Sequence, residues 1–467
     1  MTTTRDRVDA YTHEARRQIG ALLRGPDAPA IDPRRRLNRS VFAGAIIGVL
    51  ILAVTGVLGL LRGGAKSGLP DSGTVLVEGS GDRYVVIDHT LHPALNLASA
   101  KLVGGAKITM VQGKALHGAA RGLPVGIPGA PDALPGPSAL SDGDWTACVV
   151  PAEATDAKPH VSVLVGSGGG TRLAARSGVY VSADGKTSWL LAGGWRYAVP
   201  TSTRSVLPMD TSAPVRIPAE LLNTVPEAPA LRARAVPRAG DKPDVSLPYQ
   251  AKIGDLVSVP IPGTGDHSYY VVLSDGVAPI KPLAYNLLAV HAPDRTLTLA
   301  PGAVLGPQSS QDPPVSALWP DEVPTIKTPG RDQPVCVTDH PTAPAGSAPW
   351  SVGVSVPPAV PVPAGVQPVT PTGGSLPTIT SAVVIAPGTG ALIRSTTSGG
   401  ADGVLMLVTD NGLRYPIAST DAADRLGYDA GRAVPVPLPF TGLLPAGPAL
   451  DEASAAREYT GAAHPGG

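Results

Sequence analysis

The stretch GWRYAVP at residues 194–200 is written again, almost unchanged, as GLRYPIA at residues 412–418. In both copies an apolar residue precedes an Arg–Tyr pair, and apolar residues follow it. Two short matches can arise by chance. Whether the chain is duplicated therefore depends on what else recurs at a similar spacing.

Three further pairs of matches follow the same order along the chain. They are YVVIDHTLHPALNL at 84–97 with YVVLSDGVAPIKPL at 270–283, Cys148 with Cys336, and VPEAPAL at 225–231 with LPAGPAL at 444–450. The distance from the cysteine to the Arg of the pair grows from 48 to 78 residues, and the excess coincides with a Pro-rich stretch at 341–374. So many prolines exclude a helix or a central strand and favour an extended connection.

A finer pattern recurs four times, as an apolar strand, a tight turn and another apolar residue. The copies are VIDHTL at 86–91, LLAGGW at 190–195, VLSDGV at 272–277 and VTDNGL at 408–413. Each copy indicates a small β unit with a hairpin and a short helix, too small to be very stable alone. We therefore expect an elongated, β-rich α+β region of four small repeat units around a central region, with pseudo-twofold symmetry.

One long apolar stretch precedes the repeats. Residues 41–61 hold no charge, and as a helix they would extend about 31 Å, the thickness of a bilayer core. Residues 1–40 hold nine Arg and five acidic residues, which by the positive-inside rule places them in the cytosol. The alternative is a cleaved signal peptide, but the stretch is too long and no A-x-A site follows it. The predicted fold class is thus a single-pass membrane protein, with an extracytoplasmic ectodomain after one transmembrane helix.

The composition argues against one class of function, nucleic-acid binding. The net charge is zero, with 37 basic and 37 acidic residues, so the electrostatic signature of a nucleic-acid binder is missing. The cytosolic leader shows apolar residues near helical spacing and basic residues on other faces. Such a helix lies on anionic lipid or docks on a partner, and the sequence leaves both alternatives open.

The chain contains two cysteines, Cys148 and Cys336, each with an apolar, strand-like flank. In an extracytoplasmic compartment the default for two cysteines is one disulfide, here at the meeting of two related halves. The alternative is a pair of buried free thiols.

No catalytic, cofactor or metal site is predicted. Gly185-Lys186-Thr187 resembles the end of a P-loop, but position 180 is Tyr where that loop needs Gly, and a strand-like TSWLL follows. The pair Asp184-Gly185 instead favours a hairpin turn. The nine His include no H-E-x-x-H motif. We expect no cofactor and lean against an enzyme.

With these pieces placed, the chain resembles the EccB family, a membrane component of the actinobacterial type VII (ESX) secretion system. The resemblance rests on RDRVDAYTHEARRQIGALL at 5–23, DPRRR at 32–36, PVGIPGAP at 124–131, the repeated units and the two cysteines. It implies a cell-membrane location and assembly with an FtsK/SpoIIIE-type ATPase and a polytopic membrane subunit. It also implies a central disulfide-bearing region, and family members are sometimes described as ATPases themselves.

The expected organisation has ten segments. They are a basic leader (1–40), a transmembrane helix (41–61), repeat unit 1 (65–135), the first part of the central region with Cys148 (136–165), repeat unit 2 (166–235), repeat unit 3 (250–310), the second part of the central region with Cys336 (311–340), the Pro-rich connection (341–374), repeat unit 4 (375–450) and a disordered tail (451–467).

The sequence is compatible with three functions. The favoured one is a non-catalytic scaffold of the secretion complex, whose ectodomain self-associates beside a lipid bilayer. The second is an ATP-hydrolysing subunit of the same system, with Lys186 as its only local support. The third is a membrane-anchored module that binds the cell wall.

Overall fold

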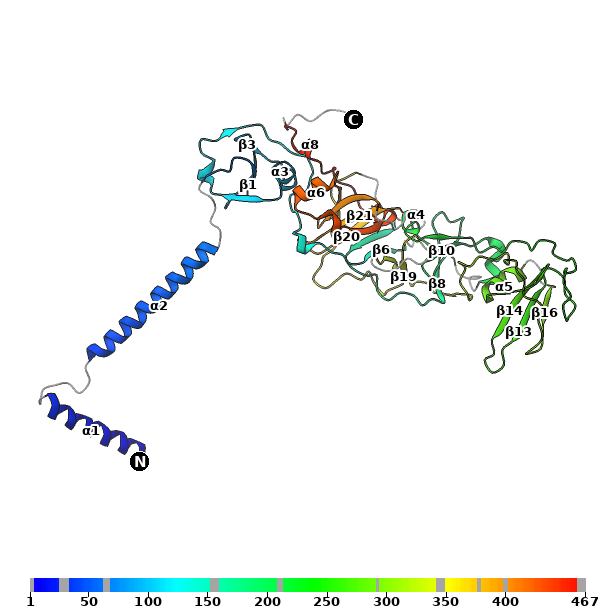
Figure 1. The fold of residues 1–467 in the computed structure, drawn as a ribbon, viewed down its shortest axis with the longest axis horizontal. Helices are drawn as coiled ribbons and strands as arrows, with labels where there is room; N and C mark the ends of the chain where they lie inside the picture. The colour runs from blue at the N-terminus through cyan, green and yellow to red at the C-terminus, as the bar shows by residue number, and fades with distance from the viewer. Residues whose placement is uncertain are drawn as a thin grey trace. The chain divides into compact units, whose positions relative to one another are not determined.

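The computed structural model describes residues 4–24, 33–61, 68–151, 159–207, 213–290, 294–341, 349–375, 379–397 and 402–459 (Figure 1). The chain divides into two compact units, Met1–Ser67 and Gly68–Gly467. Parts of the predicted leader, Pro-rich connection and tail lie outside the described residues.

The first unit consists of two helices, α1 (Thr4–Arg24) and α2 (Pro33–Leu61). Among the residues that the structure describes, no helix is long and apolar enough to cross a membrane. The predicted fold class, a single-pass membrane protein with its span at 41–61, is corrected accordingly. The described chain is an α+β protein with five small sheets.

Four of the five sheets share one order of elements. Three antiparallel strands are followed by a helical segment, and a fourth strand then returns to pair in parallel with the first. These sheets are called A, E, F and C. Sheet A holds β1 (Gly73–Val77), β2 (Arg83–Ile87), β3 (Thr90–Pro93), α3 (Leu97–Gly104) and β4 (Ile108–Val111). Sheet E holds β8 (Ser177–Ser182), β9 (Trp189–Ala192), β10 (Trp195–Ala198), a 3-10 helix (Thr201–Val206) and β11 (Val215–Arg216).

The other two sheets repeat this order in the second half of the sequence. Sheet F holds β13 (Leu256–Pro260), β14 (His267–Leu273), β15 (Gly276–Ile280), α5 (Pro282–Ala289) and β16 (Thr296–Thr298). Sheet C holds β21 (Gly390–Thr396), β22 (Val404–Thr409), β23 (Arg414–Pro416), α6 (Thr420–Leu426) and β24 (Val434–Pro437). Sheet E also includes β17 (Thr325–Ile326), which pairs in parallel with β8 from outside the predicted repeat unit 2. The boundaries of the four predicted repeat units stay a prediction.

The tight turns explain why these short strands fold back. Gly194 in sheet E and Gly412 in sheet C have positive φ in the turn, a conformation that glycine adopts without a steric penalty. In sheet F the residue after the turn, Gly276, has positive φ as the first residue of β15. In sheet A the same turn is made by Asp88 and His89, with φ of 46° and 62°. Successive positive φ values are typical of a two-residue hairpin turn whose twist matches the strands it joins.

The fifth sheet, called D, takes strands from both halves of the sequence. Its order is β19-β18-β6-β7-β20. The strands are β6 (Trp145–Val150), β7 (His160–Val165), β18 (Val335–Asp339), β19 (Val352–Ser355) and β20 (Thr380–Val384). Strands β6 and β7 precede sheets E and F in the sequence, and β18 follows them. The chain therefore leaves sheet D after β7, forms sheets E and F, and enters sheet D again at β18.

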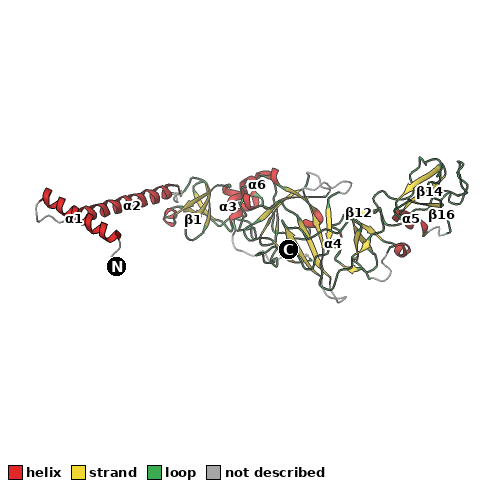
Figure 2. Ribbon diagram, turned by 90° about the horizontal axis from the view of Figure 1, so that it is seen from below, coloured by secondary structure: helices red, strands yellow, loops and turns green. Residues whose placement is uncertain are grey.

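Three shared cores connect neighbouring sheets of the second unit. One joins α3 of sheet A to sheet C, a second joins sheets C, D and E, and a third joins sheets E and F. Lys101 in α3 donates a hydrogen bond to the carbonyl of Leu426 in α6, at 2.9 Å and 325 residues away in the sequence. Both views show α3 beside α6 (Figures 1 and 2).

The remaining elements are short. They are β5 (Ala120–Arg121), α4 (Ala219–Leu222), β12 (Glu227–Ala228), β17 (Thr325–Ile326), α7 (Leu438–Thr441), α8 (Glu452–Ala455) and 3-10 turns at Gly113–Leu116, Pro137–Ala139 and Ala430–Arg432. Helix α8 lies in the segment that the sequence predicts as a tail. It packs on α3 and so returns the end of the described chain to sheet A.

Candidate functional site

The arginine of the first Arg–Tyr pair forms hydrogen bonds to a segment that follows it in the sequence. Arg196 lies in β10, and its guanidinium donates to the carbonyl of Leu222 at 2.9 Å and to the side chain of Asn223 at 2.7 Å. It also pairs with Glu227 in β12 at 3.0 Å. Leu222 ends helix α4, and its carbonyl also accepts the N–H of Val225 at 3.2 Å, so Arg196 adds a charged donor at the end of this helix.

The second pair makes the equivalent contact in sheet C. Arg414 in β23 donates through Nε to the carbonyl of Leu444, shortly after α7, at 2.9 Å. Its backbone carbonyl accepts from the N–H of Gly447 at 2.9 Å. Burial lowers the pKa of the Arg414 guanidinium. The repeated motif is thus a clamp, an arginine that holds the segment following a one-turn helix.

The two clamps meet at the central sheet. Leu221 and Leu222 of the first clamp share one core with Phe440 and Leu444 of the second, and all are at most 5% exposed. Helices α4 and α7 contact each other, and both contact β6. The two halves of the sequence are therefore joined by packing as well as by strand pairing.

Each clamp arginine is expected to stabilise the fold measurably. Arg414→Ala should lower the free energy of unfolding by about 2–3 kcal/mol, because a charged donor is lost and a buried carbonyl is left without its partner. The unfolding free energy of Arg414→Lys should lie between those of Arg414→Ala and the wild type, since an ammonium reaches the carbonyl with a different geometry. Urea titration followed by tryptophan fluorescence checks this. Equal stability of Arg414→Ala and the wild type would contradict the clamp.

A disulfide joins the same central strands. Cys148 and Cys336 lie directly opposite each other on β6 and β18, and their sulfurs are bonded. Both residues are fully buried, beneath the partly buried Val360, Val362 and Val366 of the Pro-rich connection. This is the disulfide that the sequence favours over two free thiols, and the Pro-rich connection covers it.

A buried carboxyl group lies at the end of β18. Asp339 is 2% exposed, and its Oδ2 has no hydrogen-bond partner among the described residues. Burial, and second the charge of Asp144, raise the pKa of Asp339 to about 8. Asp144 itself lies 3.0 Å from Nδ1 of His340. The sequence did not point to Asp339, because a single Asp at the end of a strand is not distinguished in sequence from an Asp on the surface.

The P-loop-like stretch forms a hairpin turn. Gly185, Lys186 and Thr187 connect β8 to β9, and Gly185 has a φ of 73°. The carboxylate of Asp184 accepts the backbone N–H groups of Lys186 at 2.8 Å and Thr187 at 2.7 Å. These bonds lower the pKa of Asp184 to about 2. A strand follows instead of the helix whose N-terminus would hold a phosphate.

In the described part of the chain, no group of three His, Cys, Asp or Glu side chains could hold a metal ion. The features described so far, namely the two clamps, the disulfide and the buried Asp339, all lie in or beside the central sheet.

The family described as "Type VII secretion system ESX-1, transport TM domain B" (T7SS_ESX1_EccB) matches residues 1–464. The chain belongs to the EccB family. The resemblance found in the sequence is therefore confirmed over almost the whole chain.

EccB proteins of mycobacteria are similar to it along nearly their whole length. "ESX-3 secretion system ATPase EccB3" of Mycolicibacterium smegmatis is 31% identical, over 97% of this chain and 90% of the relative. The protein of the same name in Mycobacterium tuberculosis H37Rv is also 31% identical, over 97% of this chain and 89% of the relative.

Solved EccB-like chains have the same fold. A chain in the structure of an intact ESX-5 inner membrane complex covers 99% of this chain and 97% of its own length, with 26% identity and a TM-score of 0.67. A chain in the structure of the EccB3 dimer from the ESX-3 core complex covers 82% of this chain and 100% of its own length, with 27% identity and a TM-score of 0.66. The predicted partners, self-association and other secretion subunits, are of the kind found around these relatives.

Proposed function

We propose that the chain is a non-catalytic structural subunit of a type VII secretion membrane complex, in which residues 68–467 hold neighbouring copies together. The observation that carries this proposal is the likeness to the chain solved as an EccB3 dimer, over 82% of this chain. At 27% identity the fold is retained. The self-association of a relative with this fold is the most direct guide to what the second unit does.

The same unit is proposed to lie outside the cytoplasm, with the N-terminus inside. The buried disulfide between Cys148 and Cys336 supports this, because disulfides persist in oxidising compartments. A second support is the structure of the periplasmic assembly from the ESX-5 inner membrane complex, one chain of which covers 86% of this chain at 26% identity.

The partners follow from the resemblance. We expect an FtsK/SpoIIIE-type ATPase and a polytopic membrane subunit to assemble with this chain, since a similar chain is part of an intact ESX-5 inner membrane complex. The nine arginines of residues 1–40 give the leader a net charge of +4 against its five acidic residues, which suits an acidic partner surface or anionic lipid.

The test is purification of the tagged full chain from its own membranes in mild detergent, followed by native mass spectrometry. A large particle with at least two copies of this chain and the two expected subunits is the predicted result. A variant without residues 68–467 should lose the contacts between copies. A monomer that brings no partner subunit would overturn the proposal.

A second candidate function has one observation in its favour, because the mycobacterial relatives are named as ATPases. The purified full chain is expected to release phosphate from ATP at the background rate, and Lys186→Ala to leave that rate unchanged, because Lys186 lies in a hairpin turn. Turnover that Lys186→Ala abolishes would establish the ATPase instead.

A further inference from the structure

One face of sheet F is only partly covered. The opposite face packs Leu256 and Val271 against α5 in a shared core. On the partly covered face, called here the outer face, Val257, Val272 and Val277 are buried. Around them lie apolar residues that keep part of their surface in solvent, namely Leu247, Tyr249, Val259, Tyr270, Leu297, Leu299 and Leu305. This amount of exposed apolar surface is typical of a contact surface.

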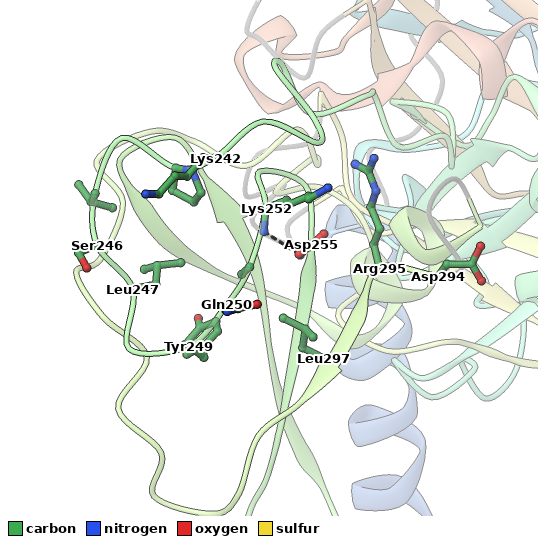
Figure 3. A pocket seen from close by; sticks show the side chains of 13 residues that line it. Lys242, Ser246, Leu247, Tyr249, Gln250, Lys252, Asp255, Asp294, Arg295 and Leu297 are labelled. Carbon is green, nitrogen blue, oxygen red and sulfur yellow. Dashed lines mark hydrogen bonds between the residues drawn. The ribbon is translucent and has the colours of Figure 1, made fainter.

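A pocket of about 870 Å³ opens at the edge of this face (Figure 3). Leu247 and Tyr249 from the loop before β13, and Leu297 from β16, form its apolar part. Lys242, Lys252 and Arg295 also line it. Its volume is within the range of ligand-binding clefts, and it combines apolar and charged walls.

The cations of the pocket are available to a ligand. Within the described part of the chain, Lys242, Lys252 and Arg295 form no ion pair. Two carboxylates also line the pocket, and one of them, Asp255, is mostly buried and accepts the backbone N–H of Lys252 at 2.7 Å. Two nearby carboxylates outside the pocket, those of Asp241 and Asp244, are held by Arg238.

Strand β16 lies beside the pocket, and no other described strand pairs with its outer edge. It is the last strand of the order β15-β14-β13-β16. The carbonyl of Arg295 accepts from Leu256, and the N–H of Leu299 donates to Ser258, so the odd-numbered residues bond to β13. In a parallel ladder the alternate residues face away. The N–H and C=O groups of Thr296 and Thr298, both exposed, therefore point outward.

We propose that the outer face of sheet F and its pocket bind an extended acidic peptide segment of a partner protein. The segment adds a strand to β16, places carboxylates beside Lys242, Lys252 and Arg295, and rests apolar side chains on Leu247 and Leu297. Main-chain bonds at a sheet edge supply affinity, while alternating side chains supply specificity. This inference does not rest on the scaffold function.

The test uses a fluorescein-labelled octapeptide of alternating Glu and Val, with alternating Lys and Val as the control peptide. Anisotropy of the acidic peptide should rise with added full-length protein, and the control peptide should not bind. Lys252→Glu/Arg295→Glu should weaken binding at least tenfold. Thr298→Pro should do the same, because it removes an outward N–H that the ladder to β13 does not use.

Lys186→Glu is the matched charge control, because Lys186 is exposed in a turn of sheet E and should leave binding within twofold of the wild type. Hydrogen exchange provides a readout that needs no variant: the Thr296 and Thr298 amides should exchange more slowly with the acidic peptide bound. Unchanged exchange, or equal binding by Lys186→Glu and Lys252→Glu/Arg295→Glu, would overturn the proposal. Displacement of the peptide by pyrophosphate, with full binding by Thr298→Pro, would also overturn it and indicate a small-anion site.

Discussion

Replacing both central cysteines, in the variant Cys148→Ser/Cys336→Ser, is expected to lower the free energy of unfolding by about 4–5 kcal/mol. The bond closes a loop with a sequence separation of 188 residues. In the chain-entropy model, opening so long a loop releases much conformational freedom in the unfolded state. Urea titration followed by tryptophan fluorescence measures the loss, because all five tryptophans lie between residues 145 and 350, in or beside sheets D, E and F.

The single variants separate the cross-link from local packing. Cys148→Ser and Cys336→Ser each remove the bond, so both should be destabilised about as much as the double variant if the cross-link dominates. The dependence of the unfolding free energy on urea should also become steeper, because an unfolded chain without the bond exposes more surface. A double variant within about 1 kcal/mol of the wild type, with an unchanged urea dependence, would contradict this account.

Asp339→Asn is expected to stabilise the protein at neutral pH, by about 2–4 kcal/mol at pH 7.5. The folded pKa of Asp339 is raised to about 8 from its ordinary value of 3.8. Between these two pH values the folded state keeps a proton that the unfolded state has released. The wild type therefore loses stability as pH rises from about 4 to about 8, by up to about 1.4 kcal/mol per pH unit from this group.

The amide of Asn cannot ionise, so the stability of Asp339→Asn should vary less with pH over that window. Asp144→Asn is the matched comparison. It removes the second cause of the raised pKa and leaves the first, burial, in place, so the pH dependence should become smaller without disappearing. Thermal unfolding at half-unit steps from pH 4 to pH 8.5 gives the three curves. Parallel curves for Asp339→Asn and the wild type would show that Asp339 does not carry this dependence.

The sequence predicted local features that depend on near neighbours. The Asp184-Gly185 pair indicated a hairpin turn where a P-loop was the alternative, and the structure places that turn between β8 and β9. The ordered matches around the two Arg–Tyr pairs indicated two related halves. Their role as clamps did not follow, because the carbonyl that Arg196 contacts is 26 residues away in the sequence. A pattern of residue types does not specify such a contact.

The pairing of strands that are distant in the sequence could not be predicted, for the same reason. Strand β20 pairs in parallel with β7, between Thr380 and Val161 and onward, across more than 200 residues. Neither strand carries a residue that marks the other. The predicted span at 41–61 came from its apolar composition, its length and the arginines before it, but no helix among the described residues is long and apolar enough to cross a membrane. Membership of the EccB family, in contrast, could be predicted, because the order of many weak motifs is specific where each motif is not.

The outward and returning passes of the chain have a mechanical consequence. Sheets E and F lie in the sequence between Cys148 and Cys336, whereas sheets A and C lie outside that interval. Tension applied to residues 68 and 459 would run through sheet A, along β6, across the sulfur–sulfur bond and back through sheet C. The covalent path of this load bypasses the 187 residues between the cysteines. In a protein held at both ends, sheets E and F would stay folded under loads that extend the rest of the second unit.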